Sequence, residues 1–182
     1  PPSRSMQQTT QRTLTRRAVM WLGQTCNQRC YFCYFLNRIE DAHHPEHPFM
    51  DLNKAKAICK TLREFYGCTA IDIQGGEPTI YPGILDLISY CRDIRLYPTL
   101  ITNGLQLAKP GELERFRDAG IRDFLVSLHG IGAIHDDVVG KTGAFTPSAT
   151  LSNWLRSGSG AVLQTGVALS SGLVLSEGLV LS

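Results

Sequence analysis

Apolar residues along the middle of the chain recur with two different periods, and the two periods alternate. Short segments in which most or every second residue is apolar predict strands, whereas an apolar residue every three to four positions predicts a helix. The strand pattern occurs at residues 18–22, 70–74, 98–102 and 123–128. The helical pattern lies between them, at residues 52–66, 82–94 and 110–119. Strands that alternate with helices in this way predict right-handed βαβ units and a parallel sheet.

Single residues mark the ends of these helices. Asp51 can cap the amino end of the first helix, and Gly67 can close its carboxyl end. Pro82 suits the first turn of the second helix, and Gly120 follows the third. Parallel strands with their helices on one side curl toward a barrel, and the chemistry of such barrels lies at the carboxyl ends of the strands.

The two ends of the chain differ from its middle. Residues 1–16 contain three arginines, many Ser, Thr and Gln residues and no acidic residue, which is typical of a solvated, disordered tail. Toward the other end, the pattern predicts a further helix at 145–155 and a candidate sixth strand at 161–169. The sequence therefore predicts a basic tail, a core domain and a low-complexity end, at residues 1–16, 17–156 and 157–182.

The low-complexity end repeats itself. It carries one charged residue, Glu177, and the run Gly-Leu-Val-Leu-Ser occurs twice, ending at Ser176 and at Ser182. A hairpin, a low-complexity tail and an altered reading frame, or a truncated one, all remain open explanations. Because no helix follows to cover these apolar residues, we expect residues 171–182 to be poorly ordered and to favour association between chains.

Composition excludes several classes of function. Hydrophobic residues make up 43% of the chain, and the net charge of +2 indicates neither a nucleic-acid nor a membrane partner. No apolar run reaches the length of a membrane-spanning helix. Cys59, Cys68 and Cys91 lie far apart in the sequence and are expected to be buried free thiols, which indicates a reducing, cytoplasmic location.

Three other cysteines lie close together, immediately after the first strand. Cys26, Cys30 and Cys33 have the spacing C-x3-C-x2-C. A [4Fe–4S] cluster usually has four thiolate ligands, so three ligands without a fourth nearby predict a cluster with one open iron. An open metal position is where a substrate or cofactor can bind.

A zinc site is the alternative interpretation of these cysteines. Structural zinc usually takes a second Cys pair or a pair of histidines, and the chain has no second C-x2-C. His43, His44 and His47 could supply a fourth ligand, but their segment contains two prolines and is more simply interpreted as a polar loop.

Polar residues also follow the other strands. Gly75-Gly76-Glu77-Pro78 comes after the second strand, where the glycines are expected to let a ligand approach the backbone and Glu77 to accept hydrogen bonds from an ammonium group. The third and fourth strands end at Thr102-Asn103-Gly104 and at Ser127-Leu128-His129-Gly130. These hydroxyl and amide groups can bind a ligand or cap the next turn.

The cysteine spacing and the Gly-Gly-Glu-Pro run together resemble the two main motifs of the radical S-adenosylmethionine (radical SAM) family. The resemblance implies a partial (β/α)6 barrel and a [4Fe–4S] cluster whose open iron binds SAM. One electron then cleaves SAM to methionine and a 5′-deoxyadenosyl radical, which abstracts hydrogen from a small-molecule or peptide substrate. The resemblance also implies an electron donor such as flavodoxin or ferredoxin.

The resemblance also implies roles for individual residues. Cys26, Cys30 and Cys33 would bind the cluster, and Phe32 would pack on the adenine of SAM. The amino group of SAM would meet Gly75, Gly76, Glu77 and Pro78, and its ribose and carboxylate would meet Thr102, Asn103 and Ser127. His129 and His135 are expected to face the region where substrate enters, with structural roles.

The resemblance covers residues 17–156 and departs from the family pattern in two places. The chain runs out near the sixth strand, which completes the adenine pocket in that family. No cysteine follows Cys91, so auxiliary clusters are not expected. A truncated, inactive fragment is therefore the main alternative to an active enzyme, followed by a non-catalytic zinc-binding module. The substrate is not predicted, beyond a loose analogy with the molybdenum-cofactor and peptide-maturing branches.

Overall fold

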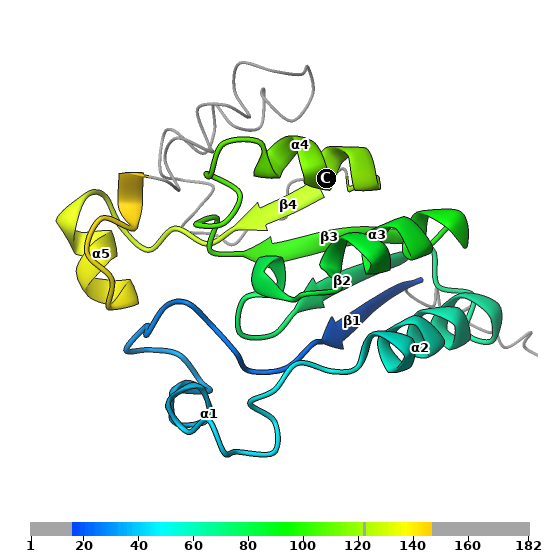
Figure 1. Cartoon of the computed structure of the whole chain (residues 1–182), viewed down its shortest axis with the longest axis horizontal. Coiled ribbons are helices and arrows are strands. Elements are labelled where there is room, and N and C mark those ends of the chain that lie inside the picture. Colours follow the sequence, from blue (N-terminus) through cyan, green and yellow to red (C-terminus); the bar gives the residue numbers. More distant parts are fainter. Residues whose placement is uncertain (1–15, 122, 147–182) are drawn as a thin grey trace, which may run out of the picture.

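A computed structural model of the chain describes residues 16–121 and 123–146, and in these residues four parallel strands form one sheet in the order β1-β2-β3-β4 (Figure 1). The strands are β1 (Arg17–Trp21), β2 (Ala70–Gln74), β3 (Tyr97–Thr102) and β4 (Asp123–Val126). The predicted parallel α/β fold is confirmed, although β4 ends before the predicted residue 128.

Successive strands are joined by the helices that the apolar period predicts, α2 (Leu52–Glu64), α3 (Ile84–Asp93) and α4 (Glu112–Ala119). Two further helices, α1 (Leu36–Glu40) and α5 (Ala133–Val139), and a 3-10 turn, η1 (Pro78–Ile80), were not predicted. Both helices lie beyond the arrowheads of the strands in Figure 1, at the carboxyl edge of the sheet.

The expected helix ends are largely confirmed. The Asp51 carboxylate caps α2 by accepting hydrogen bonds from the backbone N–H groups of Asn53 and Lys54, at 2.9 and 3.1 Å. Gly120 closes α4 in the left-handed region, with φ 107°. Pro82 is not in the first turn of α3, because that helix begins at Ile84, after the cap residue Gly83.

The hydrophobic core lies between the sheet and α2, α3 and α4. Ile71 and Ile73 of β2, Leu100 of β3 and Leu87 and Ile88 of α3 are fully buried there. On the other face of the sheet, Val19, Trp21 and Tyr97 are exposed. This second face, on which none of α2, α3 and α4 packs, is the one that turns inward in a barrel.

Cys59 of α2 and Cys91 of α3 meet inside this core. Both are fully buried free thiols, and their sulfur atoms are 3.6 Å apart. The expectation of buried free thiols is confirmed for these residues and for Cys68. Cys59 and Cys91 are far apart in the sequence but close together in the structure, because α2 packs on α3.

Several predictions fall outside the described residues. The basic tail at 1–15, most of the helix at 145–155, the strand at 161–169 and the repeats at 171–182 lie there, so the division of the chain into three segments remains a prediction. Within the described part, no helix is long and apolar enough to cross a membrane.

Candidate functional site

The segments that follow the four strands lie together and are joined by hydrogen bonds. The backbone N–H of Glu77, after β2, donates to the carbonyl of Thr25 in the cysteine loop at 2.9 Å. The side-chain amide of Asn103, after β3, donates to Asn27 at 2.7 Å. Ser127, after β4, donates its N–H to the Thr102 carbonyl at 2.9 Å. The structure therefore brings the sequence-predicted residues to one edge of the sheet.

Cys26, Cys30 and Cys33 are partly buried free thiols on one loop, and the N–H of Cys33 donates to the carbonyl of Cys30 at 2.9 Å. Burial raises the pKa of the Cys26 thiol to about 11, and the charges of Glu77 and of the other two cysteines add to this. Burial and the nearby Cys33 raise the pKa of Cys30 as well. A metal that binds Cys26 and Cys30 as thiolates must therefore displace protons from them.

This donor set fits an iron–sulfur cluster. Three thiols on one loop can each bind a different iron of a [4Fe–4S] cluster, as such clusters require. Among residues 16–121 and 123–146, no group of three His, Cys, Asp or Glu side chains is arranged to hold a single metal ion.

The last turn of α5 holds the cysteine loop. The N–H groups of Arg29 and Tyr31 donate to the carbonyls of Val139 and Val138, at 3.0 and 3.2 Å. Gly140 follows with φ 62°, and a Cβ atom there would lie 2.6 Å from the Arg29 carbonyl oxygen. A glycine is therefore needed where the end of α5 meets the loop.

Phe32 reaches from the cysteine loop to the segment after β4. Its side chain is half exposed, and its ring centre lies 4.6 Å from that of His129. His129 in turn stacks on His135 at 6.1 Å. The prediction that His135 faces an open substrate region is wrong, because His135 is fully buried and its Nδ1 atom accepts a hydrogen bond from the His129 N–H at 3.1 Å.

Acid is expected to loosen the contact between α5 and the cysteine loop. Burial lowers the pKa of His135 below 6.5, so the unfolded state takes up a proton more readily than the folded state. The stability that neutral His135 contributes is complete above pH 6.5 and is lost as the pH falls through the lowered pKa. Protonation also adds a proton at Nδ1, which accepts from His129.

Hydrogen exchange measures this effect. The amides of Arg29 and Tyr31 should lose protection between pH 7.5 and pH 5.5, whereas amides of α2, which contains no histidine, should keep theirs. In His135→Gln the amide oxygen can accept from His129 without titrating, so the loss should shrink to the part that comes from His129, whose pKa is also lowered by burial. Equal protection of the Arg29 amide at both pH values in the unaltered chain would contradict the role of His135 in this contact.

Glu77 is a buried connector between three segments. Its side chain is 1% exposed. Oε1 accepts hydrogen bonds from the N–H and hydroxyl of Thr79 and from the Thr102 hydroxyl, at 3.0, 2.5 and 2.7 Å. Oε2 accepts from the N–H of Asn103 at 2.8 Å. Each carboxylate oxygen has two lone pairs, and from the described residues Oε2 accepts a single hydrogen bond, so Oε2 has room for another donor.

Burial raises the pKa of Glu77, and its four hydrogen-bond donors oppose this shift. Within the described residues, no Lys or Arg forms an ion pair with this carboxylate. A buried negative charge without a cation is unfavourable, so a positively charged group that reached Oε2 would be bound favourably.

Gly75 and Gly76 are needed for the packing of the backbone, and the approach of a ligand to them stays a prediction. A Cβ atom on Gly75 would lie 2.5 Å from the Gly23 carbonyl oxygen, and one on Gly76 would lie 2.2 Å from that of Thr25. The space beside both glycines is thus filled by the backbone that leads into the cysteine loop. The N–H of Gly76 also donates to Gly23 at 2.8 Å, so the glycines let β1 and β2 stay paired beyond the strands.

The remaining predicted residues cap turns at the same edge. The Thr102 hydroxyl accepts from the N–H of Gly104 at 3.0 Å, and the Asn103 side chain accepts from that of Leu105 at 3.1 Å. Pro78 begins the 3-10 turn η1. The capping roles weighed for Thr102 and Asn103 are therefore present, and they leave the proposed contacts with SAM untested.

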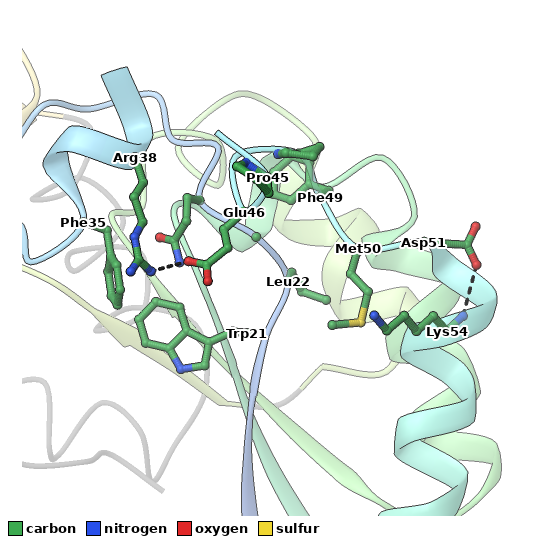
Figure 2. Close-up of a pocket in the computed structure, with 13 residues that line it drawn as sticks. Trp21, Leu22, Phe35, Arg38, Pro45, Glu46, Phe49, Met50, Asp51 and Lys54 are labelled. Atoms are coloured by element: carbon green, nitrogen blue, oxygen red, sulfur yellow. Dashed lines mark hydrogen bonds and ion pairs between the residues drawn. The ribbon is translucent and has the colours of Figure 1, made fainter. Parts of the chain in front are cut away.

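A cavity of about 680 Å³ lies beside the end of β1 (Figure 2). Phe35 contacts Trp21 edge to face, with 4.7 Å between the ring centres. The Arg38 guanidinium lies over the Phe35 ring and forms an ion pair with Glu46. Figure 2 shows these side chains at one end of the cavity and Lys54 toward the other. Its lining comes from β1, α1, the histidine-containing loop and α2, so no sequence motif marked it, and none of the three clustered cysteines lines it.

Comparison with known proteins identifies the family. The model of the radical SAM superfamily matches residues 22–160, so the chain belongs to this superfamily. The chain is 29% identical over 134 residues to an AdoMet-dependent heme synthase of Oleidesulfovibrio alaskensis, a match that covers 72% of this chain and 33% of that protein. It is also 29% identical over 114 residues to a GTP 3′,8-cyclase of Pectobacterium atrosepticum, covering 62% and 33%.

The fold agrees with this assignment. SuiB of Streptococcus suis, in a crystal structure bound to S-adenosylmethionine, matches with a TM-score of 0.63 and 19% identity, over 90% of this chain and 39% of that one. The chain spans about a third of the length of the curated relatives it matches. Members of the superfamily are enzymes that use a [4Fe–4S] cluster and SAM.

Proposed function

We propose that this chain is the core of a radical SAM enzyme in which Cys26, Cys30 and Cys33 hold a [4Fe–4S] cluster with one open iron. The observation that carries the proposal is the position of these three thiols on one loop, hydrogen-bonded to the segment that contains Glu77 and to α5. When bound, the cluster and SAM together supply a 5′-deoxyadenosyl radical that abstracts hydrogen from a substrate.

The chain's own residues would bind and orient SAM. The free position on Oε2 of Glu77 suits the ammonium group, because the buried carboxylate lacks a cationic partner among the described residues. Phe32, half exposed beside the cysteines, offers a ring on which adenine can stack. Thr102, Asn103 and Ser127 would hydrogen-bond the ribose and carboxylate. Gly75, Gly76 and Pro78 would shape the backbone that surrounds the amino group.

The substrate of this chain is proposed only as a class. Relatives named as a heme synthase, a GTP cyclase and a PqqA peptide cyclase indicate a small molecule or a peptide. The electron would come from a donor such as flavodoxin or ferredoxin. The six free cysteines support a reducing, cytoplasmic location.

Anaerobic reconstitution with iron and sulfide tests this function. Visible and Mössbauer spectra should show a [4Fe–4S] cluster, and added SAM should change the signal of one iron in four. Dithionite and SAM should then yield 5′-deoxyadenosine. A cluster that binds SAM without cleavage would instead indicate an inactive fragment, and zinc without iron would indicate a binding module.

A further inference from the structure

Gln28 lies between two of the predicted cluster ligands and turns its side chain into the protein. The side chain is 4% exposed. Its Oε1 atom is 3.8 Å from the sulfur of Cys30, which donates a weak S–H hydrogen bond to it. Its Nε2 atom is buried and has no hydrogen-bond partner among the described residues. The oxygen of the Gln28 amide therefore faces the Cys30 thiol, and the NH2 group of the same amide has no hydrogen-bond partner among the described residues.

The neighbours of Gln28 in the loop hold it in this position. Asn27 accepts a hydrogen bond from the Asn103 side chain at 2.7 Å, which ties the loop to the end of β3. The guanidinium of Arg29 donates to the backbone carbonyls of Cys26 and Gln28, at 3.0 and 2.9 Å. Of the three side chains between Cys26 and Cys30, Gln28 is the one with a hydrogen bond to a sulfur within the described residues.

Iron binding would change the hydrogen bonds that the Cys30 sulfur can form. A thiolate ligand carries no proton, so it can only accept hydrogen bonds, and the Gln28 oxygen beside it would be repelled. The oxygen and NH2 ends of an amide have nearly the same size, so a half-turn of the amide brings Nε2 to the position that Oε1 now holds. This rotation would replace a weak S–H bond by an N–H bond to a charged sulfur.

We propose that Gln28 donates a hydrogen bond to the iron-bound thiolate of Cys30 and thereby raises the reduction potential of the cluster. The assignment rests on the proposed function. Reduction adds negative charge to the cluster and its sulfurs, and an N–H dipole aimed at one of them stabilises the reduced state more than the oxidised state. Gln28 is thus a positioning and tuning residue.

The test compares Gln28→Leu with Gln24→Leu in the reconstituted chain. Gln24 is a matched control, because it is 5% exposed, also has an amide atom without a partner, and forms no hydrogen bond with a cysteine within the described residues. A redox titration followed by electron paramagnetic resonance should show a more negative midpoint potential in Gln28→Leu only. Its iron–thiolate stretching band should move to higher frequency, because the sulfur has lost a donor.

A second variant keeps the test independent of local packing. Gln28→Met retains the length of the side chain without a donor, and it should shift the potential in the same direction. An unchanged potential in either Gln28 variant overturns the assignment. So does loss of iron from both variants with an unchanged circular dichroism spectrum, since the role would then be assembly. No cluster in the unaltered chain would instead overturn the proposed function, and this assignment with it.

Discussion

Cys30→Ala should lose the brown [4Fe–4S] chromophore almost completely after anaerobic reconstitution. The variant leaves two thiolates, and a cluster with two protein ligands is poorly held. Cys30 lies in the middle of the loop, where it contacts the Gln28 amide and forms a turn with Cys33. Visible absorbance, with iron and sulfide analysis, measures the loss.

Cys68→Ala is the matched control for this substitution. Cys68 is a buried free thiol in the core, away from the loop, so its replacement should leave iron and sulfide content unchanged. Similar iron content in the Cys30 and Cys68 variants would show that the C-x3-C-x2-C run is not the cluster site. Replacement of Cys59 or Cys91 should likewise spare the cluster.

Glu77→Gln should destabilise the fold as well as weaken SAM binding. Each carboxylate oxygen of Glu77 accepts at least one backbone N–H, from Thr79 at Oε1 and from Asn103 at Oε2. Whichever way the glutamine amide is turned, its NH2 group faces one of these donors, and a backbone N–H cannot turn away. A buried donor without a partner costs about 1–3 kcal/mol, and the free energy of unfolding should fall by about that amount.

Chemical denaturation of the apo protein measures this loss, with Glu114→Gln as control. Glu114 is exposed on α4, and the same chemical change there should alter stability by less than about 0.5 kcal/mol. Equal unfolding free energies for the two variants would contradict the connecting role of Glu77.

The effect on SAM is measured separately, in reconstituted protein at a temperature where both variants are folded. If the ammonium group binds the free position on Oε2, Glu77→Gln should weaken SAM binding by about 1.5–3 kcal/mol, the value of a charged hydrogen bond. Unchanged affinity would leave Glu77 with its structural role alone.

Much of the fold could be predicted because its signals are local. The pattern at 70–74 predicted β2 with the bounds that the structure has, and Asp51 marked the start of α2. Helices α1 and α5 were missed because their five and seven residues are too short to show a helical period. Missing α5 also led to the wrong position for His135, which α5 buries against the segment after β4.

Part of the site could also be predicted from the sequence. The residues at the strand ends could be named because the carboxyl ends of parallel strands share one edge. Their partners could not be named, since Glu77 meets Thr102 and Asn103 across 25 and 26 positions of the chain. The glycines were predicted to let a ligand approach the backbone, but the backbone that packs beside them could not be named, because it comes from the cysteine loop, far earlier in the sequence.

The sequence by itself determined the class of fold, the family motifs and the three clustered cysteines. These depend on residues that are close neighbours along the chain, whose spacing is set by covalent geometry and by the strand and helix periods. Only the tertiary structure decided that Glu77 is a buried connector, that Gly75 and Gly76 accommodate backbone, and that the Gln28 amide faces a thiol. Which lone pair or donor remains unused depends on segments that meet only when the sheet and its loops pack together.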